Sequence, residues 1–272
     1  MGSPKRLAMF VDGWNMYWSL VGHKIRPYGW CDFKKLARQK LSEQGGAYHD
    51  AIVKVKFFTS EDLPHPEKIN RQQKIWSMAL TFTGCQIVWG EFRPTHVEVE
   101  EQLRDSGKRW REKQTDIALA SHLIADCNQI AIDKTRSGAY SWSPGYDEAI
   151  VLSQDSDFIP AVKIVSELPF NRRVHVFLPP SEFRSQENAM RLWRPISGPT
   201  VVIHQLSKAD YAKSLLPRVI PGPNGQSVTC YHTWMWREKY ESENTGQSVA
   251  SVADLQAKYP GRTQLPTCQK PA

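Results

Sequence analysis

The chain has 272 residues, of which 40% are hydrophobic and 11% aromatic, enough to bury a sizeable core and to exclude wholesale disorder. Its 35 Lys and Arg outnumber 28 Asp and Glu, so the formal net charge is +7. This excess favours anionic partners such as nucleic acid.

The cysteines and the apolar runs limit the cellular compartment. Five cysteines are scattered without a C-x-x-C pair, which matches neither a disulfide framework nor a structural zinc site. The first apolar run ends at Asp12, and no stretch approaches the ~20 apolar residues of a membrane span. We therefore expect a protein of the reducing cytoplasm that has no membrane contact.

Apolar runs alternate with amphipathic stretches along most of the chain. Strands are predicted at 7–11, 51–58, 86–92, 148–154, 173–179 and 200–206. Helices are predicted at 31–43, 69–80, 115–127, 158–168 and 208–216. Such alternation requires crossover connections, so we expect an α/β fold of three layers, with a mostly parallel central sheet flanked by helices.

Three segments depart from this alternation. Residues 93–114 are mostly polar, which predicts an exposed basic connection, and the glycine-containing stretch before 148 predicts a loop. From residue 221 the chain is turn-rich and short of aliphatic residues. We therefore expect one domain over 1–220 and a flexible or partly docked tail over 221–272, through which a protein partner or a second copy could bind.

Carboxylates from separate segments are expected at one edge of this sheet. Asp12 ends the first strand, Asp155 and Asp157 follow the strand at 148–154, and Asp116 lies in the first turn of a helix. Ligands of parallel sheets bind beyond the carboxyl ends of the strands. Converging carboxylates repel one another unless a cation offsets the repulsion, and Mg²⁺ or Mn²⁺ suits oxygen ligands. Such ions can activate water against a phosphodiester, which predicts hydrolysis.

Each acid also has a structural interpretation. Asp12 followed by Gly13 is an ordinary turn pair, and Asp116 complements a helix dipole. The segment Asp155–Asp157 fits a capped loop, or the D-x-D motif of a sugar-nucleotide transferase. The transferase alternative leaves Asp12 and Asp116 without a role, so the joint placement of the acids favours hydrolysis.

Two polar residues are candidates for supporting the acids. Asn15 follows Asp12 by three positions and could orient its carboxylate through the side-chain amide, or cap the next turn. Ser153 could hydrogen-bond a carboxylate, a phosphate or the backbone.

Binding of a phosphate backbone requires cations outside the acidic cluster. Basic side chains gather around one tryptophan before the helix at 115, in the set Arg104, Lys108, Arg109, Trp110, Arg111 and Lys113. The cations would contact RNA phosphates and the indole would stack on a base, whereas the alternative is a solvated loop.

Three motifs occur in an order that is typical of one family. The first is VDGWNMYWSL, with an apolar strand, Asp-Gly and a nearby Asn. The second is EKQTDIALASHLIADC, with an Asp at a helix start, and the third is YDEAIVLSQDSDFIPAVKIV, in which a strand leads to an acidic turn and a helix. Over residues 6–215 the chain thus resembles NYN-domain proteins, the LabA-like branch of the PIN-like nuclease superfamily.

The resemblance implies a PIN-like fold and a divalent-metal-dependent ribonuclease that leaves a 5′-phosphate and a 3′-hydroxyl. The acids that match the family motifs are Asp12, Asp116, Asp155 and Asp157. Mg²⁺ or Mn²⁺ is the implied cofactor and RNA the implied partner.

Two positions depart from the family pattern. Gln154 occupies the usual glycine place, where a side chain could intrude on the site, and His122 stands where many relatives repeat an acid. We expect His122 to be a surface or core histidine rather than a ligand. Both departures favour an alternative function, a non-catalytic RNA-binding or adaptor protein that keeps the fold.

Overall fold

The computed structural model describes residues 4–22, 29–43, 45, 48–60, 67–95, 109–127, 129–134, 140–180 and 186–230. Within them, only the backbone is described at 21–22, 67–72, 91–95, 109–113, 129–134 and 140–144. These residues belong to one compact unit, Met1–Trp234.

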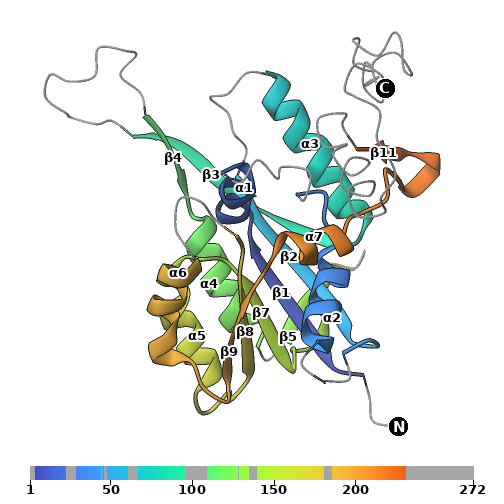
Figure 1. The fold of residues 1–272 in the computed structure, drawn as a ribbon. Coiled ribbons are helices and arrows are strands. Elements are labelled where there is room, and N and C mark those ends of the chain that lie inside the picture. The colour runs from blue at the N-terminus through green and yellow to red at the C-terminus, as the bar shows by residue number, and fades with distance from the viewer. Residues whose placement is uncertain are drawn as a thin grey trace, which may run out of the picture. The chain divides into compact units, whose positions relative to one another are not determined.

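A seven-stranded sheet forms the centre of this unit (Figure 1). Its strands, in spatial order, are β4 (Arg109–Lys113), β3 (Cys85–Thr95), β2 (Ile52–Ser60), β1 (Arg6–Asp12), β7 (Glu148–Leu152), β8 (Arg173–Leu178) and β9 (Val201–Gln205). All neighbouring strands are parallel except the antiparallel pair of β3 and β4. The prediction of a mostly parallel sheet is confirmed.

Helices cover both faces of the sheet (Figure 1). One face packs against α4 (Thr115–Ala125), α5 (Ile159–Ser166) and α6 (Gln186–Trp193), and the other against α2 (Phe33–Ser42) and α3 (Glu67–Phe82), while α7 (Lys208–Lys213) packs on α2. Alternate strand residues supply the two cores. Phe10 belongs to the core beneath α4 and α5, whereas Phe57 contacts Phe33 and Trp76 on the other face. The three-layer α/β fold is confirmed.

The order of the strands places β1 and β7 side by side at the centre. The chain runs from β1 through β2 to β3 in one direction, and later from β7 through β8 to β9 in the other. The segments that leave β1 and β7 are α1 (Gly13–Gly22) and the short helix η2 (Ser156–Phe158). Ligands of open α/β sheets bind where the strand order reverses in this way.

The prediction of an exposed connection over 93–114 is wrong in part. β3 continues to Thr95, and β4 pairs with it so that Arg111 lies opposite Arg93. Charged residues are common on edge strands because they discourage pairing with other chains. Residues 96–108 lie outside the described residues, and they include the predicted RNA contacts Arg104 and Lys108.

Hairpins replace two other predicted irregular segments. β5 (Gln129–Lys134) pairs with β6 (Tyr140–Pro144) where a loop was expected. β10 (Val219–Pro221) pairs with β11 (Ser227–Thr229) around the short helix η4 (Pro223–Gly225), across the predicted boundary at residue 221 between domain and tail. The second hairpin packs on α3, because a Cβ at Gly222 would collide with the ring of Phe82. Residues 231–272 lie outside the described residues.

Two smaller observations concern the cysteines and the helices. Four described cysteines are buried and free, namely Cys31, Cys85, Cys127 and Cys230. In the described part of the chain, no helix combines the length and the apolar character that a membrane crossing needs.

Candidate active site

The Asp12 carboxylate is fixed at the carboxyl end of β1. The apolar residues before it are fully buried in the sheet, and Asp12 itself is only 7% exposed. Its Oδ1 accepts a hydrogen bond from the backbone N–H of Asn15 at 3.0 Å, and its Oδ2 accepts one from the Ser153 hydroxyl at 2.8 Å. Asp12 is therefore an ordered buried acid.

Gly13 allows α1 to begin directly after this acid. A Cβ at this position would lie 2.6 Å from the carbonyl oxygen of Phe58 and 2.5 Å from the ring of Phe57. Only glycine permits so close an approach of α1 to β2 without movement of the backbone.

The turn after β7 is tied to the turn after β1. The Ser153 hydroxyl, which donates to Asp12, also accepts the N–H of Asp155 at 3.0 Å. The Asn15 side-chain oxygen accepts the N–H of Gln154 at 2.9 Å. Ser153 thus contacts a carboxylate, one of the roles considered for it. Asn15 contacts Asp12 through its backbone N–H rather than through the side-chain amide, the first of the two roles considered for it.

Gln154 is accommodated without occupying the space beside the acids. Its side-chain amide is buried and donates to the carbonyl oxygen of Pro179 at 2.6 Å. Its φ is not among the positive φ angles of the described residues, so the backbone here does not need glycine. The departure from the family pattern therefore leaves this turn intact.

The four predicted acids act on one another electrostatically. Burial raises the pKa of Asp12 from 3.8 to about 7, against the hydrogen bonds from Asn15 and Ser153, and the charges of Asp116 and Asp155 raise it further. Partial burial of its carboxyl group, followed by the charges of Asp155 and Asp157, also raises the pKa of Asp116. Asp116 and Asp157 are exposed residues and Asp155 is half-buried.

Asp116 lies in the first turn of α4, as predicted. The helix begins after Gln114, whose φ of 78° is left-handed and whose side chain makes no capping hydrogen bond. The next residue, Thr115, has a buried hydroxyl with no hydrogen-bond partner in the described part of the chain. A buried polar atom without a partner beside Asp116 is unusual in a protein interior.

The donor chemistry at this edge fits a hard divalent cation. Within the described residues, none of the four acids forms an ion pair with Lys, Arg or His, so their charge is not compensated. Carboxylate oxygens are the ligands that Mg²⁺ and Mn²⁺ prefer. No three His, Cys, Asp or Glu side chains in the described ranges lie close enough to form a ready-made metal group. Coordination would therefore require the more exposed acids to turn toward Asp12.

His122 lies outside this cluster and has a structural role. Its Nδ1 lies 2.9 Å from the ammonium group of Lys56, which forms an ion pair with Asp126, and its ring lies 5.6 Å from that of Phe58. Because the lysine is the donor, Nδ1 of His122 is the acceptor. The position carries a packed histidine, as expected.

Aromatic side chains of α1 lie directly beyond Asp12. The ring centroids of Trp14 and Trp18 are 6.4 Å apart, and Tyr17 contacts both edge-on. Trp14 donates from its indole nitrogen to the Ser60 hydroxyl at 2.8 Å, whereas Trp18 is 52% exposed. Trp18 therefore presents part of its indole to solvent.

The predicted nucleic-acid contacts Arg109, Trp110, Arg111 and Lys113 lie on β4, which ends two residues before α4 begins. Their backbone therefore leads directly to Asp116. This places the predicted nucleic-acid contacts next to the acids along the chain.

Comparison with known proteins gives no functional assignment. No protein-family model matches the chain, and no protein of curated function is similar to it. A crystal structure of a protein of unknown function from Vibrio parahaemolyticus matches 79% of this chain and 100% of its own, at 16% identity and a TM-score of 0.43. This likeness names no activity.

Proposed function

We propose that the protein is a divalent-metal-dependent ribonuclease of the NYN type. The observation that supports this best is a buried carboxylate, Asp12, without a compensating cation in the described residues, at the point where the strand order reverses. The like charges of Asp116 and Asp155 act on it. Burial and like charges around an uncompensated carboxylate lower the stability of the fold, and a bound cation would offset this loss.

Two of the acids, Asp12 and Asp155, are anchored by hydrogen bonds, and the other two, Asp116 and Asp157, are exposed. Asn15 and Ser153 hold Asp12 in one orientation, and the Asp155 carboxylate accepts the N–H of Asp157 at 3.0 Å, which orders the turn between them. Asp12, Asp116 and Asp155 would hold Mg²⁺ or Mn²⁺, and Asp157 would complete the shell or orient a water. The ion would supply activation of water and stabilisation of the leaving oxygen.

The surroundings of the acids favour RNA with unpaired bases. Trp18 offers an exposed indole on the helix that follows Asp12, and such rings stack on bases of single strands. Cations of β4 would contact the phosphates, which the acids themselves repel. We propose the cytoplasm as the location, consistent with the free buried cysteines.

Cleavage of labelled RNA in the presence of Mn²⁺ tests the proposal. Asp12→Asn and Asp155→Asn should each abolish cleavage, whereas Asp50→Asn, a change of the same kind at an exposed residue before β2, should not. Cleavage that survives both substitutions at the acids would reject this site.

A second candidate is an RNA-binding or adaptor protein that cuts nothing. It is favoured by the lack of a ready-made metal group among the described residues. Calorimetric titration with Mn²⁺ separates the candidates. Divalent binding that is lost in Asp12→Asn supports the nuclease, whereas salt-sensitive RNA binding without divalent binding supports the adaptor.

A further inference from the structure

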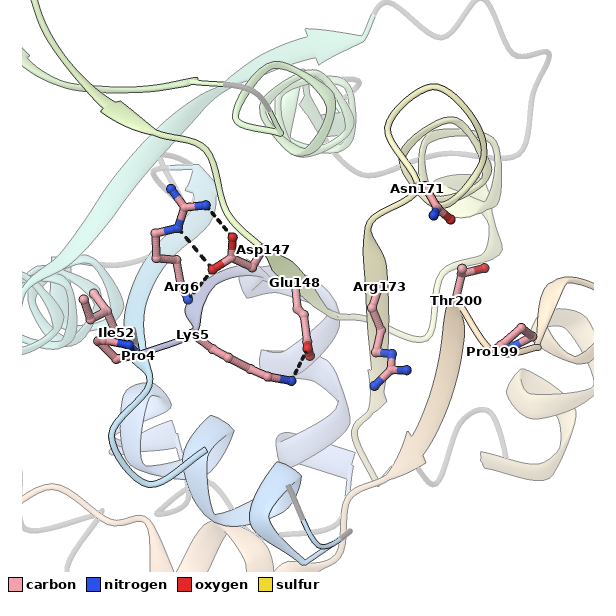
Figure 2. A pocket seen from close by; sticks show the side chains of 10 residues that line it. All are labelled: Pro4, Lys5, Arg6, Ile52, Asp147, Glu148, Asn171, Arg173, Pro199 and Thr200. Carbon is pink, nitrogen blue, oxygen red and sulfur yellow. Dashed lines mark hydrogen bonds and ion pairs between the residues drawn. The ribbon is translucent and has the colours of Figure 1, made fainter. Parts of the chain in front are cut away.

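A pocket of about 880 Å³ lies at the amino ends of the parallel strands, at the edge of the sheet opposite the four acids (Figure 2). Its volume is typical of sites for small molecules, which span roughly 300–1,000 Å³. Its charged lining consists of Lys5, Arg6, Arg173, Asp147 and Glu148. The partners of these five side chains determine which ligand the pocket fits.

Both oxygens of the Glu148 carboxylate are already occupied. Oε1 accepts from the ammonium group of Lys5 at 2.6 Å, and Oε2 accepts from the Tyr48 hydroxyl at 2.9 Å. The Nε2 of His175, buried behind the pocket, lies 2.8 Å from the same Oε2. Glu148 is therefore held by three groups and cannot turn toward another cation.

The second carboxylate, Asp147, is equally engaged. It accepts hydrogen bonds from the guanidinium group of Arg6 through both oxygens, and from the Arg6 backbone N–H at 2.9 Å. The Arg172 charge also acts on Asp147. The two carboxylates that line the pocket thus pair with Lys5 and Arg6 and not with Arg173.

Arg173 is the uncompensated cation of this pocket. It is exposed at the first position of β8, and its side chain extends from that strand in Figure 2. Among the described residues it forms neither an ion pair nor a hydrogen bond through its side chain. A guanidinium group presents several N–H donors in a plane that matches phosphate oxygens.

The remaining lining is partly apolar. Ile52 is 49% exposed and lines the pocket together with Pro4 and Pro199, while Thr200 adds a hydroxyl. An inorganic ion would leave this apolar wall in water, whereas an organic group would cover it.

We propose that this pocket binds a small phosphate monoester, with its phosphate on Arg173 and on the one N–H donor of Lys5 that neither Glu148 nor Tyr48 uses, and with its organic part against Ile52. A phosphate dianion suits the local excess of positive charge better than a carboxylate does, because it carries more charge and more acceptor oxygens. The pocket is separate from the four acids, so this proposal does not depend on ribonuclease activity.

Isothermal titration of the full chain in EDTA tests the proposal, with AMP, adenosine and inorganic phosphate as probes. AMP should bind more tightly than phosphate, and adenosine should not bind. Arg173→Gln should weaken AMP binding by roughly 10-fold or more, since it removes charge-assisted hydrogen bonds. Arg191→Gln, at an exposed arginine of α6 outside the pocket, and Asp12→Asn should bind AMP like the wild type.

Three results would overturn the proposal. The first is no binding of AMP or phosphate up to about 10 mM, a concentration that would detect even very weak sites. The second is unchanged AMP binding in Arg173→Gln, once its thermal melting has been shown to match that of the wild type. The third is adenosine or phosphate binding as tightly as AMP. Equal binding of adenosine would mean that Arg173 and Lys5 contribute nothing, and equal binding of phosphate would mean that the apolar wall at Ile52 contributes nothing.

Discussion

Replacing Asp12 by asparagine should stabilise the protein at alkaline pH in the absence of divalent metal. Burial raises the pKa of Asp12 from 3.8 to about 7, so the folded state resists ionisation of this group. Between these two values the folded protein binds the proton more tightly than the unfolded chain does. The stability of the wild type therefore falls as the pH rises through this window. Asparagine has no charge to lose.

The size of the effect follows from the two pKa values. A difference of roughly three pH units corresponds to about 4 kcal/mol once the folded-state group is fully ionised. Between about pH 5 and pH 8, the unfolding free energy of Asp12→Asn should gain about 2–3 kcal/mol relative to the wild type. Urea unfolding in EDTA at the two pH values measures this gain.

A matched substitution should have the opposite sign. The Arg6 guanidinium beside Asp147 lowers the pKa of that carboxyl, so Asp147→Asn should lose stability relative to the wild type once the pH exceeds the usual range of an aspartate. Mn²⁺ should stabilise the wild type more than Asp12→Asn. If the difference in unfolding free energy between Asp12→Asn and the wild type does not change with pH, burial does not raise the pKa of Asp12 and the reasoning fails.

Three further predictions concern other parts of the molecule. Gly13→Ala should lower the unfolding free energy by about 1–3 kcal/mol, because its Cβ would meet the Phe58 carbonyl oxygen at 2.6 Å; an unchanged urea midpoint would contradict this close approach. Burial, with the charges of His175 and Lys40, lowers the pKa of His204 from 6.5 to about 4. The unfolding free energy of the wild type should therefore fall as the pH falls from 6.5 toward 4, and that of His204→Gln should fall less. Equal losses of unfolding free energy in the two proteins would refute this prediction. Trp18→Ala in an Asp155→Asn background should weaken single-stranded RNA binding by about 1–3 kcal/mol in fluorescence anisotropy, and an unchanged Kd would remove Trp18 from the RNA surface.

The sequence predicts best the elements whose pattern reflects burial. The apolar runs that became β1 and β7 are buried on both faces of the sheet, so no alternation was needed to recognise them. α2 was expected at 31–43 and spans Phe33–Ser42, with the Asp32 side chain accepting the N–H of Lys35 at its start. The cap at Asp32 and the burial of the apolar face of α2 therefore favour the same helix.

The elements that were missed lack such a pattern. α1 is rich in aromatic residues around its circumference, and the described apolar side chains that it buries fully are Met16 and Leu20. β4 has the sequence RWREK, in which no run of apolar residues indicates a strand. Its pairing with β3 depends on a partner that the composition of the segment does not reveal.

The candidate site was predictable in outline only. The rule for parallel sheets placed Asp12 and Asp155 at one edge, where the structure has them. The hydrogen bond from Gln154 to Asn15 joins positions 139 apart in the chain, and such pairs leave no local signal. The hydrogen bond from the Gln154 side chain to the Pro179 carbonyl oxygen likewise depends on another strand, because Pro179 directly follows β8.

The bond between Ser153 and Asp12 also bears on the synthesis of the protein. The two residues are separated by 141 positions, so Asp12 lacks its hydrogen bond to Ser153 until β7 has been translated and has paired with β1. A growing polypeptide on the ribosome therefore holds no finished acidic centre before Asp157 has been translated. If the protein cleaves RNA, this delay shields its own messenger from the nascent product until that point.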